Sequence, residues 1–147
     1  DATPILQNAF RQAEPLAHQQ HVTLSLQLTT DNRLSADAHK LAEIVENLLS
    51  NAIKYNHPGG TVTLTSLRDS LHYNLIFQDT GIGIPAAEHA RVFTKFFRSD
   101  TSEARSRPGT GLGLFVVRML TEKMGGKVSF TSTAGFGSTF ILQFPAL

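Results

Sequence analysis

The chain has 147 residues, a formal net charge of +1 and no cysteine. A chain of this length is expected to form one domain, residues 1–147, that buries roughly two thirds of its unfolded surface. The absence of cysteine excludes disulfides, zinc–thiolate sites and thiol catalysis. The balanced charge argues against nucleic-acid binding, no apolar run approaches the ~18 to 20 residues of a membrane span, and no signal peptide is recognisable. Because the chain starts at Asp1 without Met, we expect it to be part of a longer protein.

The N-terminal quarter predicts a helix followed by a strand. Thr3 is expected to cap the helix, with Pro4 in its first turn. Its apolar positions recur at helical spacing and are Leu6, Phe10, Ala13 and Ala17. Pro15 lies inside this helix and predicts a kink or a local break. Residues 22–28 alternate between apolar and polar, which predicts a strand with one solvated face, and residues 33–35 suggest a further short strand.

The segment from His39 to Gly60 contains the strongest helical pattern of the chain. Its apolar stripe comprises Leu41, Ile44, Val45, Leu48, Leu49, Ala52 and Ile53. Ser35 or Asp37 is expected to cap the helix. Tyr55 closes it, and the turn residues 56–60 stop it.

The polar face of this helix carries two asparagines one turn apart, Asn47 and Asn51, preceded by Glu43 and followed by Lys54. Asn forms helices less readily than Lys or Glu, because its amide competes for backbone hydrogen bonds. One interpretation is that both are polar residues at the edge of the core stripe. The other is that their carbonyl oxygens bind a hard cation such as Mg²⁺, which prefers oxygen ligands. The helix alone leaves both interpretations open.

The second half of the chain predicts strands over residues 61–67 and 71–78, joined as a hairpin. A short helix is expected over residues 85–93. Residues 94–110 are rich in charge, Ser, Pro and Gly and form the longest irregular stretch, and long loops are usually functional or mobile. Residues 111–124 predict a second strong helix.

A closing hairpin is expected from strands at residues 127–133 and 138–144. The total is about three main helices and about five strands, mostly connected by hairpins. This pattern predicts an α+β fold of two layers, with the helices on one face of a mixed, mostly antiparallel sheet.

Two glycine motifs carry chemical information. Asp79 ends a predicted strand and is followed by Gly81 and Gly83. A buried carboxylate beside glycines can accept a hydrogen bond from an exocyclic amine, and the N6 group of adenine fits that description. An Asp-capped turn without a ligand explains the same residues, so both interpretations stay open for this motif alone.

The second motif, residues 109–114, runs directly into a predicted helix. Glycines at a helix N-terminus expose amides to an anion, and the helix dipole adds to the attraction, so the motif predicts a phosphate site. A dinucleotide fingerprint and a protein-kinase glycine loop both require a third Gly, whereas Leu114 occupies that position. The sequence of a P-loop occurs nowhere in the chain.

Five motifs together resemble those of two-component histidine kinases, in the family's order and with its spacing, across almost the whole chain. They are Asn47-x-x-x-Asn51-Ala-Ile-Lys54-Tyr55 (N box), Asp79-Thr-Gly81-Ile-Gly83-Ile84-Pro85 (G1 box), Phe93-Thr-Lys95-Phe96-Phe97-Arg98 (F box), Gly109-Thr-Gly111-Leu-Gly113-Leu114 (G2 box) and Gly135-Phe-Gly137-Ser138-Thr139-Phe140 (the last glycine motif). The resemblance implies the ATP-binding catalytic domain of these kinases. Its fold would be the Bergerat-type α/β sandwich that gyrase, mismatch-repair and chaperone ATPases share.

The resemblance also implies roles at the phosphates of ATP. Asn51 would bind Mg²⁺, Asn47 would assist at the metal or the phosphates, and Lys54 would contact phosphate oxygens. Lys95 and Arg98 would reach the terminal phosphates from a nucleotide lid at residues 94–110. Position 95 is often Arg in the family, and Lys keeps the charge but lacks the bidentate geometry. Arg105 and Arg107 are interpreted as a solvated charge run rather than as phosphate contacts.

At the base, the resemblance implies that Asp79 accepts the adenine amine, that Tyr55 lies against the nucleotide and that Thr139 supports adenine from the sheet. The remaining residues assigned to nucleotide binding come from the two glycine boxes and are Gly81, Gly83, Ile84, Gly109, Thr110, Gly111, Leu112, Gly113 and Leu114.

The family's phosphoacceptor histidine is not recognisable in this chain. None of the six histidines has the acceptor context, and each is expected at a surface or turn: His18, His21, His39, His57, His72 and His89. The resemblance therefore implies a catalytic half whose partners are a helical dimerisation and phosphoacceptor domain and a response regulator. It implies the cytoplasmic portion of a bacterial sensor, without direct nucleic-acid or membrane contact in this fragment.

Two alternative functions share the fold: an ATP-hydrolysing enzyme of the gyrase or chaperone type, and a serine kinase of the anti-sigma type. The hydrolases place a Glu one turn before the metal-binding Asn, as a general base for water. Here that position is Asn47, which cannot take a proton, and Glu43 lies a further turn away. The F box and the long lid argue against the serine kinase.

Overall fold

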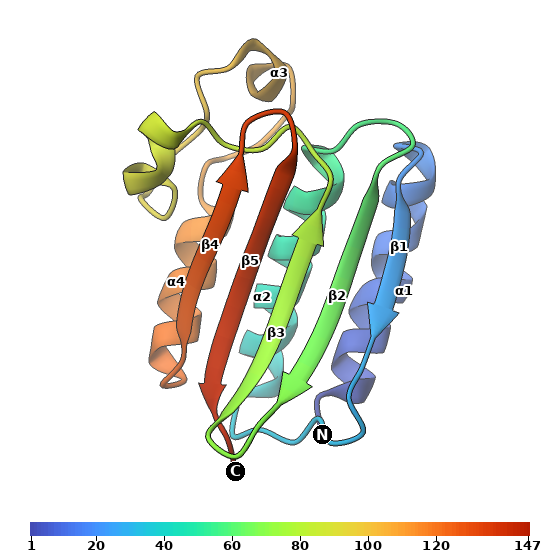
Figure 1. Cartoon of the computed structure of the whole chain (residues 1–147), viewed down its shortest axis with the longest axis vertical. Helices are drawn as coiled ribbons and strands as arrows, with labels where there is room; N and C mark the ends of the chain where they lie inside the picture. The colour runs from blue at the N-terminus through green and yellow to red at the C-terminus, as the bar shows by residue number, and fades with distance from the viewer.

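The computed structural model describes residues 1–147 as two layers, a five-stranded sheet and a set of helices on one of its faces (Figure 1). The strands are β1 (Thr23–Gln27), β2 (Thr61–Arg68), β3 (His72–Asp79), β4 (Lys127–Thr133) and β5 (Gly137–Pro145). The main helices are α1 (Thr3–Gln19), α2 (Ala38–Lys54) and α4 (Gly113–Lys123); α3 (Ser102–Arg105) and the 3₁₀ helix η1 (Ala86–Arg91) are short. The predicted α+β sandwich is confirmed. No helix combines the length and the apolar character required to span a bilayer.

The strands are ordered β1-β2-β3-β5-β4, and only β1 and β2 run parallel. Both predicted hairpins, β2–β3 and β4–β5, are present. The register places Asp79 at the end of β3 opposite Val62 of β2 and Ser138 of β5. The last residue of β3 therefore lies in the middle of one edge of the sheet, where its side chain can reach a site between the two layers.

The hydrophobic core lies between α2 and the sheet. All seven apolar residues predicted for the stripe of α2 are buried. They meet inward-facing side chains of the three central strands, which include Val62, Leu64, Tyr73, Leu75, Phe77, Leu142 and Phe144. Each large apolar side chain buried in this way stabilises the fold by about 1.5 to 3 kcal/mol, so tertiary packing fixes the position of α2. Of the two predicted caps, Asp37 is the one found, and its carboxylate accepts from the amide of Lys40 at 3.0 Å.

Two expectations for the first 35 residues were wrong, and for Pro15 the alternative of a local break is excluded. Ala2, not Thr3, precedes the first helix, and the carboxylate of Asp1 accepts from the Thr3 amide at 2.9 Å. The helix continues through Pro15 without a break, because its buried face packs against α2 and offsets the missing hydrogen bond. No strand forms at residues 33–35, since the carboxylate of Asp31 accepts from the Arg33 amide at 3.1 Å and turns the chain locally.

Candidate functional site

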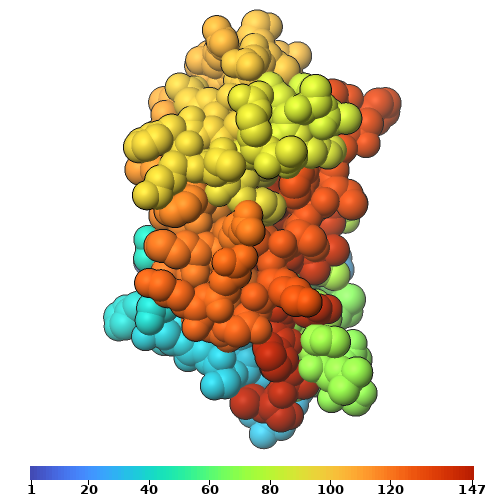
Figure 2. All heavy atoms as spheres, turned by 90° about the vertical axis from the view of Figure 1, so that its left-hand side faces the viewer, coloured from blue at the N-terminus to red at the C-terminus, as the bar shows by residue number.

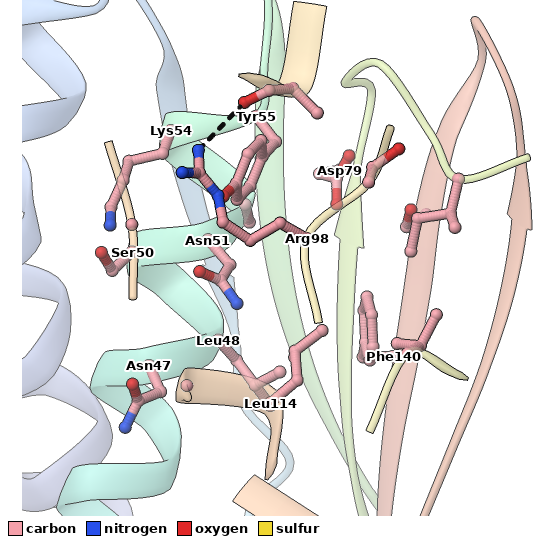
Figure 3. A pocket seen from close by; sticks show the side chains of 18 of the residues that line it. Asn47, Leu48, Ser50, Asn51, Lys54, Tyr55, Asp79, Arg98, Leu114 and Phe140 are labelled. Carbon is pink, nitrogen blue, oxygen red and sulfur yellow. Dashed lines mark hydrogen bonds between the residues drawn. The ribbon is translucent and has the colours of Figure 1, made fainter. Parts of the chain in front are cut away.

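A pocket lies between the C-terminal half of α2 and the edge of the sheet where β3 ends. Figure 3 shows the labelled side chains of α2 on one side, Asp79 and Phe140 of the sheet on the other, and Arg98 between them. Most of the predicted site residues line this pocket: Asn47, Asn51, Lys54, Tyr55, Asp79, Gly83, Ile84, Arg98, Gly109, Thr110, Gly111, Gly113 and Leu114. Residues far apart in the sequence therefore converge on one cavity.

The polar face of α2 supplies amide oxygens to the pocket. The Asn47 side chain donates to the carbonyl of Glu43 at 2.9 Å, which leaves its own oxygen free to accept. That oxygen faces the first residue of α4, because a Cβ placed on Gly113 would lie 3.0 Å from it. The chain has no group of three His, Cys, Asp or Glu side chains that could hold a metal. Neutral amide oxygens instead suit a hard cation that a ligand's phosphates help to bind.

The N-terminus of α4 faces the same part of the pocket. No side chain caps the helix, so the amides of its first turn are free to bind an anion. Gly111 precedes the helix with φ of +75°, and a Cβ there would lie 2.7 Å from the backbone of Phe96. This positive φ is the reason that the helix begins at Gly113 rather than at residue 111 as predicted. The geometry therefore places uncapped helix amides beside the asparagines.

Asp79 is the only carboxylate among the residues that line the pocket. Burial raises the pKa of Asp79 to about 6, although hydrogen bonds from the amides of Gly81 and Ser138 oppose the shift. The Gly81 amide donates to Asp79 at 2.8 Å. Gly81 itself does not line the pocket: a Cβ there would lie 2.3 Å from the carbonyl oxygen of Tyr55, so the glycine lies behind the carboxylate. At neutral pH the carboxylate is mostly ionised and can accept hydrogen bonds from a ligand.

The loop after β3 is fixed to the β4–β5 hairpin. Gly83 has φ of +67°, and a Cβ there would lie 2.1 Å from the carbonyl oxygen of Thr133. The amide of Ile84 donates to the hydroxyl of Ser132 at 2.8 Å, and this hydroxyl lies 2.7 Å from that of Ser138. The wall of the pocket around Asp79 is therefore part of the folded sheet rather than a free loop.

The structure does not bring Thr139 to the pocket; Ser138 lines it instead. Successive side chains of a strand point to opposite faces, and β5 directs Ser138 and Phe140 toward the helices. Thr139 lies with Ile141 on the other face of the sheet. The alternation of polar and apolar residues in the sequence contained this information, because Ser138 shares the parity of Phe140 and Leu142.

Lys95 and Leu112 also lie outside the pocket. Lys95 is exposed, and its ammonium lies 5.0 Å from the centroid of the Phe115 ring on α4. Phe96, with φ of +62°, turns the chain immediately after it. Leu112 directly precedes α4, so it can contribute to an anion site only through its backbone.

Residues 94–110, which we call the lid, cover one end of the pocket. Figure 2 shows η1 and the lid gathered at one end of the molecule, above α4. The lid is not wholly irregular, since it contains α3, where the Thr101 hydroxyl accepts from the Ala104 amide at 3.2 Å. Ala104 is buried and lines the pocket. Arg98 donates from its guanidinium to the carbonyls of Ala104 and Arg107.

Sequence reasoning missed Glu88, a buried carboxylate of η1, the short helix that precedes the lid. It accepts from the hydroxyl of Ser99 at 2.6 Å and from the amide of Asp100 at 2.8 Å. A buried charge requires such partners, so Glu88 fixes the residues that follow Arg98. An acidic residue in a short surface helix gives no sequence signal for this role.

Most other residues that sequence reasoning missed are apolar. Leu48 and Ala52 belong to the core stripe of α2, and Phe77 and Phe140 extend inward from β3 and β5. These side chains belong to the core and also form an apolar wall of the pocket. The helical pattern placed Leu48 and Ala52 in the apolar stripe, and nothing in the sequence separated the apolar residues that face the cavity.

The chain belongs to the family described as "Histidine kinase-, DNA gyrase B-, and HSP90-like ATPase", whose profile matches residues 36–147. The relationship predicted from the five motifs is confirmed. The circadian input-output histidine kinase CikA of Synechococcus elongatus is 44% identical over 127 residues, which cover 84% of this chain and 17% of that protein. The sensor protein SrrB of Staphylococcus aureus is 35% identical over 111 residues, 76% of this chain and 19% of that protein.

Solved structures agree with the family. The mycobacterial sensor histidine kinase MprB superposes with a TM-score of 0.85 at 30% identity, over 99% of this chain and 95% of that one. Full-length ShkA, solved in complex with AMPPNP, superposes with a TM-score of 0.84 at 28% identity, over 97% of this chain and 29% of that one. The chain spans less than a fifth of the length of CikA and SrrB.

Proposed function

We propose that this domain binds ATP and Mg²⁺ and transfers the γ-phosphate to a histidine on a separate helical dimerisation and phosphoacceptor domain. One observation favours phosphoryl transfer over ATP hydrolysis. Of the residues that line the pocket, Asp79 is the only acidic one, and none is histidine. Asp79 lies on the sheet, across the cavity from the asparagines of α2 (Figure 3).

The hydrolases of this fold need a general base beside the γ-phosphate to activate water. Asn47 occupies that position here, and its amide already donates to its own helix. An imidazole needs no such base, because its neutral nitrogen attacks directly. Phosphoryl transfer then depends mainly on alignment and on neutralising charge, which amides, a cation and basic side chains provide.

We assign the nucleotide one orientation. Asp79 accepts a hydrogen bond from the adenine amine, with Ser138 rather than Thr139 beside it and apolar side chains against the ring. The amides at the start of α4 bind the phosphates. Asn51, assisted by Asn47, would hold Mg²⁺, which would reduce the negative charge of the phosphates. Lys54 and Arg98 supply positive charge, while Lys95 is left out because it lies against Phe115.

The partners follow from this chemistry. The acceptor histidine belongs to a helical domain of the same sensor kinase, and a response regulator takes the phosphoryl group from it. The named relatives, a circadian input-output histidine kinase and a sensor protein, support this role. Because ATP is the phosphoryl donor, we place the domain in the cytoplasm. We propose no nucleic-acid partner and no membrane contact for this domain.

The proposal is tested by incubating the domain with γ-labelled ATP, alone and with a helical domain that carries an acceptor histidine. Alone, the domain should bind ATP, hydrolyse it very slowly and remain unlabelled. The added domain should gain acid-labile label, weakly, because the effective concentration that a linker provides is lost. Acid-stable label on this chain would indicate a serine kinase. Rapid phosphate release without a partner would indicate a hydrolase.

The metal assignment has its own test. Asn51→Ala should remove the Mg²⁺ dependence of ATP binding, because Asp79, the one carboxylate that lines the pocket, lies across the cavity and does not replace the amide oxygen. The measurement is the ratio of ATP affinities with Mg²⁺ and with chelator, by calorimetry. Asn74→Ala, on the open face of the sheet, is the control and should keep the wild-type ratio. A wild-type ratio in Asn51→Ala would reassign the metal to Asn47.

A further inference from the structure

Arg107 supplies the side-chain hydrogen bonds that join the lid to the end of α2. Its guanidinium donates to the carbonyl of Lys54 and, at 2.9 Å, to the carbonyl of Asn56. These residues lie 53 and 51 positions earlier in the chain. Figure 1 shows α3 and the rest of the lid at the end of the molecule where α2 terminates. The contact therefore connects the least regular segment of the domain to its central helix.

The end of a helix is a favourable place for this cation. The last carbonyls of a helix lack intrahelical partners, and the helix dipole makes that end negative. α2 ends at Lys54, and the amide of its cap residue Tyr55 donates to the carbonyls of Asn51 and Ile53, which leaves the Lys54 carbonyl to Arg107. Arg107 thus supplies donors that the helix terminus needs, and a charged donor forms the stronger type of hydrogen bond.

Arg107 also receives a contact. Its own carbonyl accepts from the guanidinium of Arg98, the lid residue that lines the pocket. A chain of hydrogen bonds therefore runs from Arg98 through residue 107 to the terminus of α2. The expectation that Arg107 belongs to a solvated charge run was wrong. Arg105 does fit that description, since it is exposed and pairs with Asp100 at 2.9 Å.

We propose that Arg107 is a positioning residue that latches the lid to the C-terminus of α2 and so holds Arg98, Ala104 and the glycines before α4 against the pocket. It acts through the end of the helix and not through a direct contact with phosphate. The consequence for nucleotide affinity rests on the proposed function. The consequence for the empty protein does not, because the latch is formed by this chain alone.

The first test uses amide hydrogen exchange of the nucleotide-free domain. Arg107→Ala should accelerate exchange at Ala104, Arg105 and Ser106, whose amides donate within the lid, by about tenfold or more. Exchange in β3 and β5 should stay unchanged. Arg105→Ala is the matched control, since it removes the same charge from the same lid but breaks only an exposed ion pair. Equal lid exchange in the wild type and in Arg107→Ala would overturn the proposal.

Arg107→Lys keeps the charge but loses the planar guanidinium, so its lid should exchange at a rate between those of the wild type and Arg107→Ala. This variant decides the question by the same readout if Arg107→Ala fails to fold.

The second test measures ADP and ATP affinities. A latch predicts an equal fold-loss for both nucleotides in Arg107→Ala, whereas a direct γ-phosphate contact predicts a loss for ATP alone and would overturn the proposal. If the wild type binds neither nucleotide, the proposed function fails, while exchange in the empty protein still tests the latch.

Discussion

The two ends of the pocket are built in different ways. Around Asp79, the walls are strands and a loop that are fixed by close backbone packing at Gly83 and Gly137. At the other end, the lid contains one helix of four residues and depends on side-chain contacts from Glu88 and Arg107. The interactions that hold the first end are also those that hold the sheet. The interactions that hold the second end are few, and we expect them to break without unfolding the domain.

The largest expected effect is on the free energy of unfolding, and it concerns Gly137, a glycine that both the sheet and the wall of the pocket require. Gly137 has φ of +118°, and a Cβ there would lie 2.1 Å from the carbonyl oxygen of Asp79. Gly137→Ala combines backbone strain with overpacking and should lower the free energy of unfolding by about 2 to 5 kcal/mol. Gly135→Ala, in the same hairpin with φ of +83° and open space around it, should cost only the strain, about 1 to 2 kcal/mol. Chemical denaturation measures the free energy of unfolding of both variants. Equal losses of stability would contradict the role of Gly137 in both the sheet and the pocket.

The next effect concerns the carboxylate that the strands position. Asp79→Asn should weaken ATP binding about ten- to hundredfold, because a buried charged hydrogen bond is worth roughly 1.5 to 3 kcal/mol. It should also relax the preference against GTP, since the new amide can donate to the oxygen of guanine. Calorimetry with both nucleotides measures the change. Unchanged ATP affinity would exclude Asp79 as the reader of adenine.

The raised pKa of Asp79, about 6, predicts opposite pH dependences for binding and for stability. Only the carboxylate accepts the adenine amine, so ATP affinity should fall by up to about tenfold per pH unit below 6. The folded empty protein favours the protonated acid. Its contribution to stability is therefore full below the unfolded pKa and is lost as pH rises through 6, by up to about 3 kcal/mol. Asp79→Asn should remove both dependences. A wild-type ATP affinity that is flat between pH 5 and pH 7 would contradict the assignment.

The sequence predicted the first end of the pocket better than the second. The stripe of α2, the strand before Asp79 and the glycines near it are local patterns, and the hydrophobic core makes the structure follow them. The error at Thr139 came from assigning a role by motif where the period of two in β5 indicated Ser138. At this end of the pocket, both the apolar pattern and the packing involve residues that are neighbours within regular helices and strands. A sequence shows such local relationships most directly.

The lid was not predictable in the same way. The position of Lys95 depends on the left-handed turn at Phe96, and that of Arg107 depends on two carbonyls more than 50 positions away. Glu88 is buried only because the lid folds over it. No periodicity records such contacts, since each joins irregular backbone to a distant element through a single polar side chain. At this end of the pocket, such contacts determine the positions of the residues that the motifs misplaced or missed.

The smallest expected effect tests the difference between the two ends directly. Lid amides should exchange faster than those of β3 and β5 in the empty protein, because local opening breaks only the contacts of a few polar side chains. A nonhydrolysable ATP analogue should slow exchange within residues 94–110, since bound phosphates add charged contacts to Arg98 and to the start of α4. Exchange in β1, at the far edge of the sheet, serves as the internal control and should change little. Equal protection of the lid amides with and without the analogue would mean that the lid is as stable a part of the pocket wall as the strands. The proposed difference between the two ends would then be wrong.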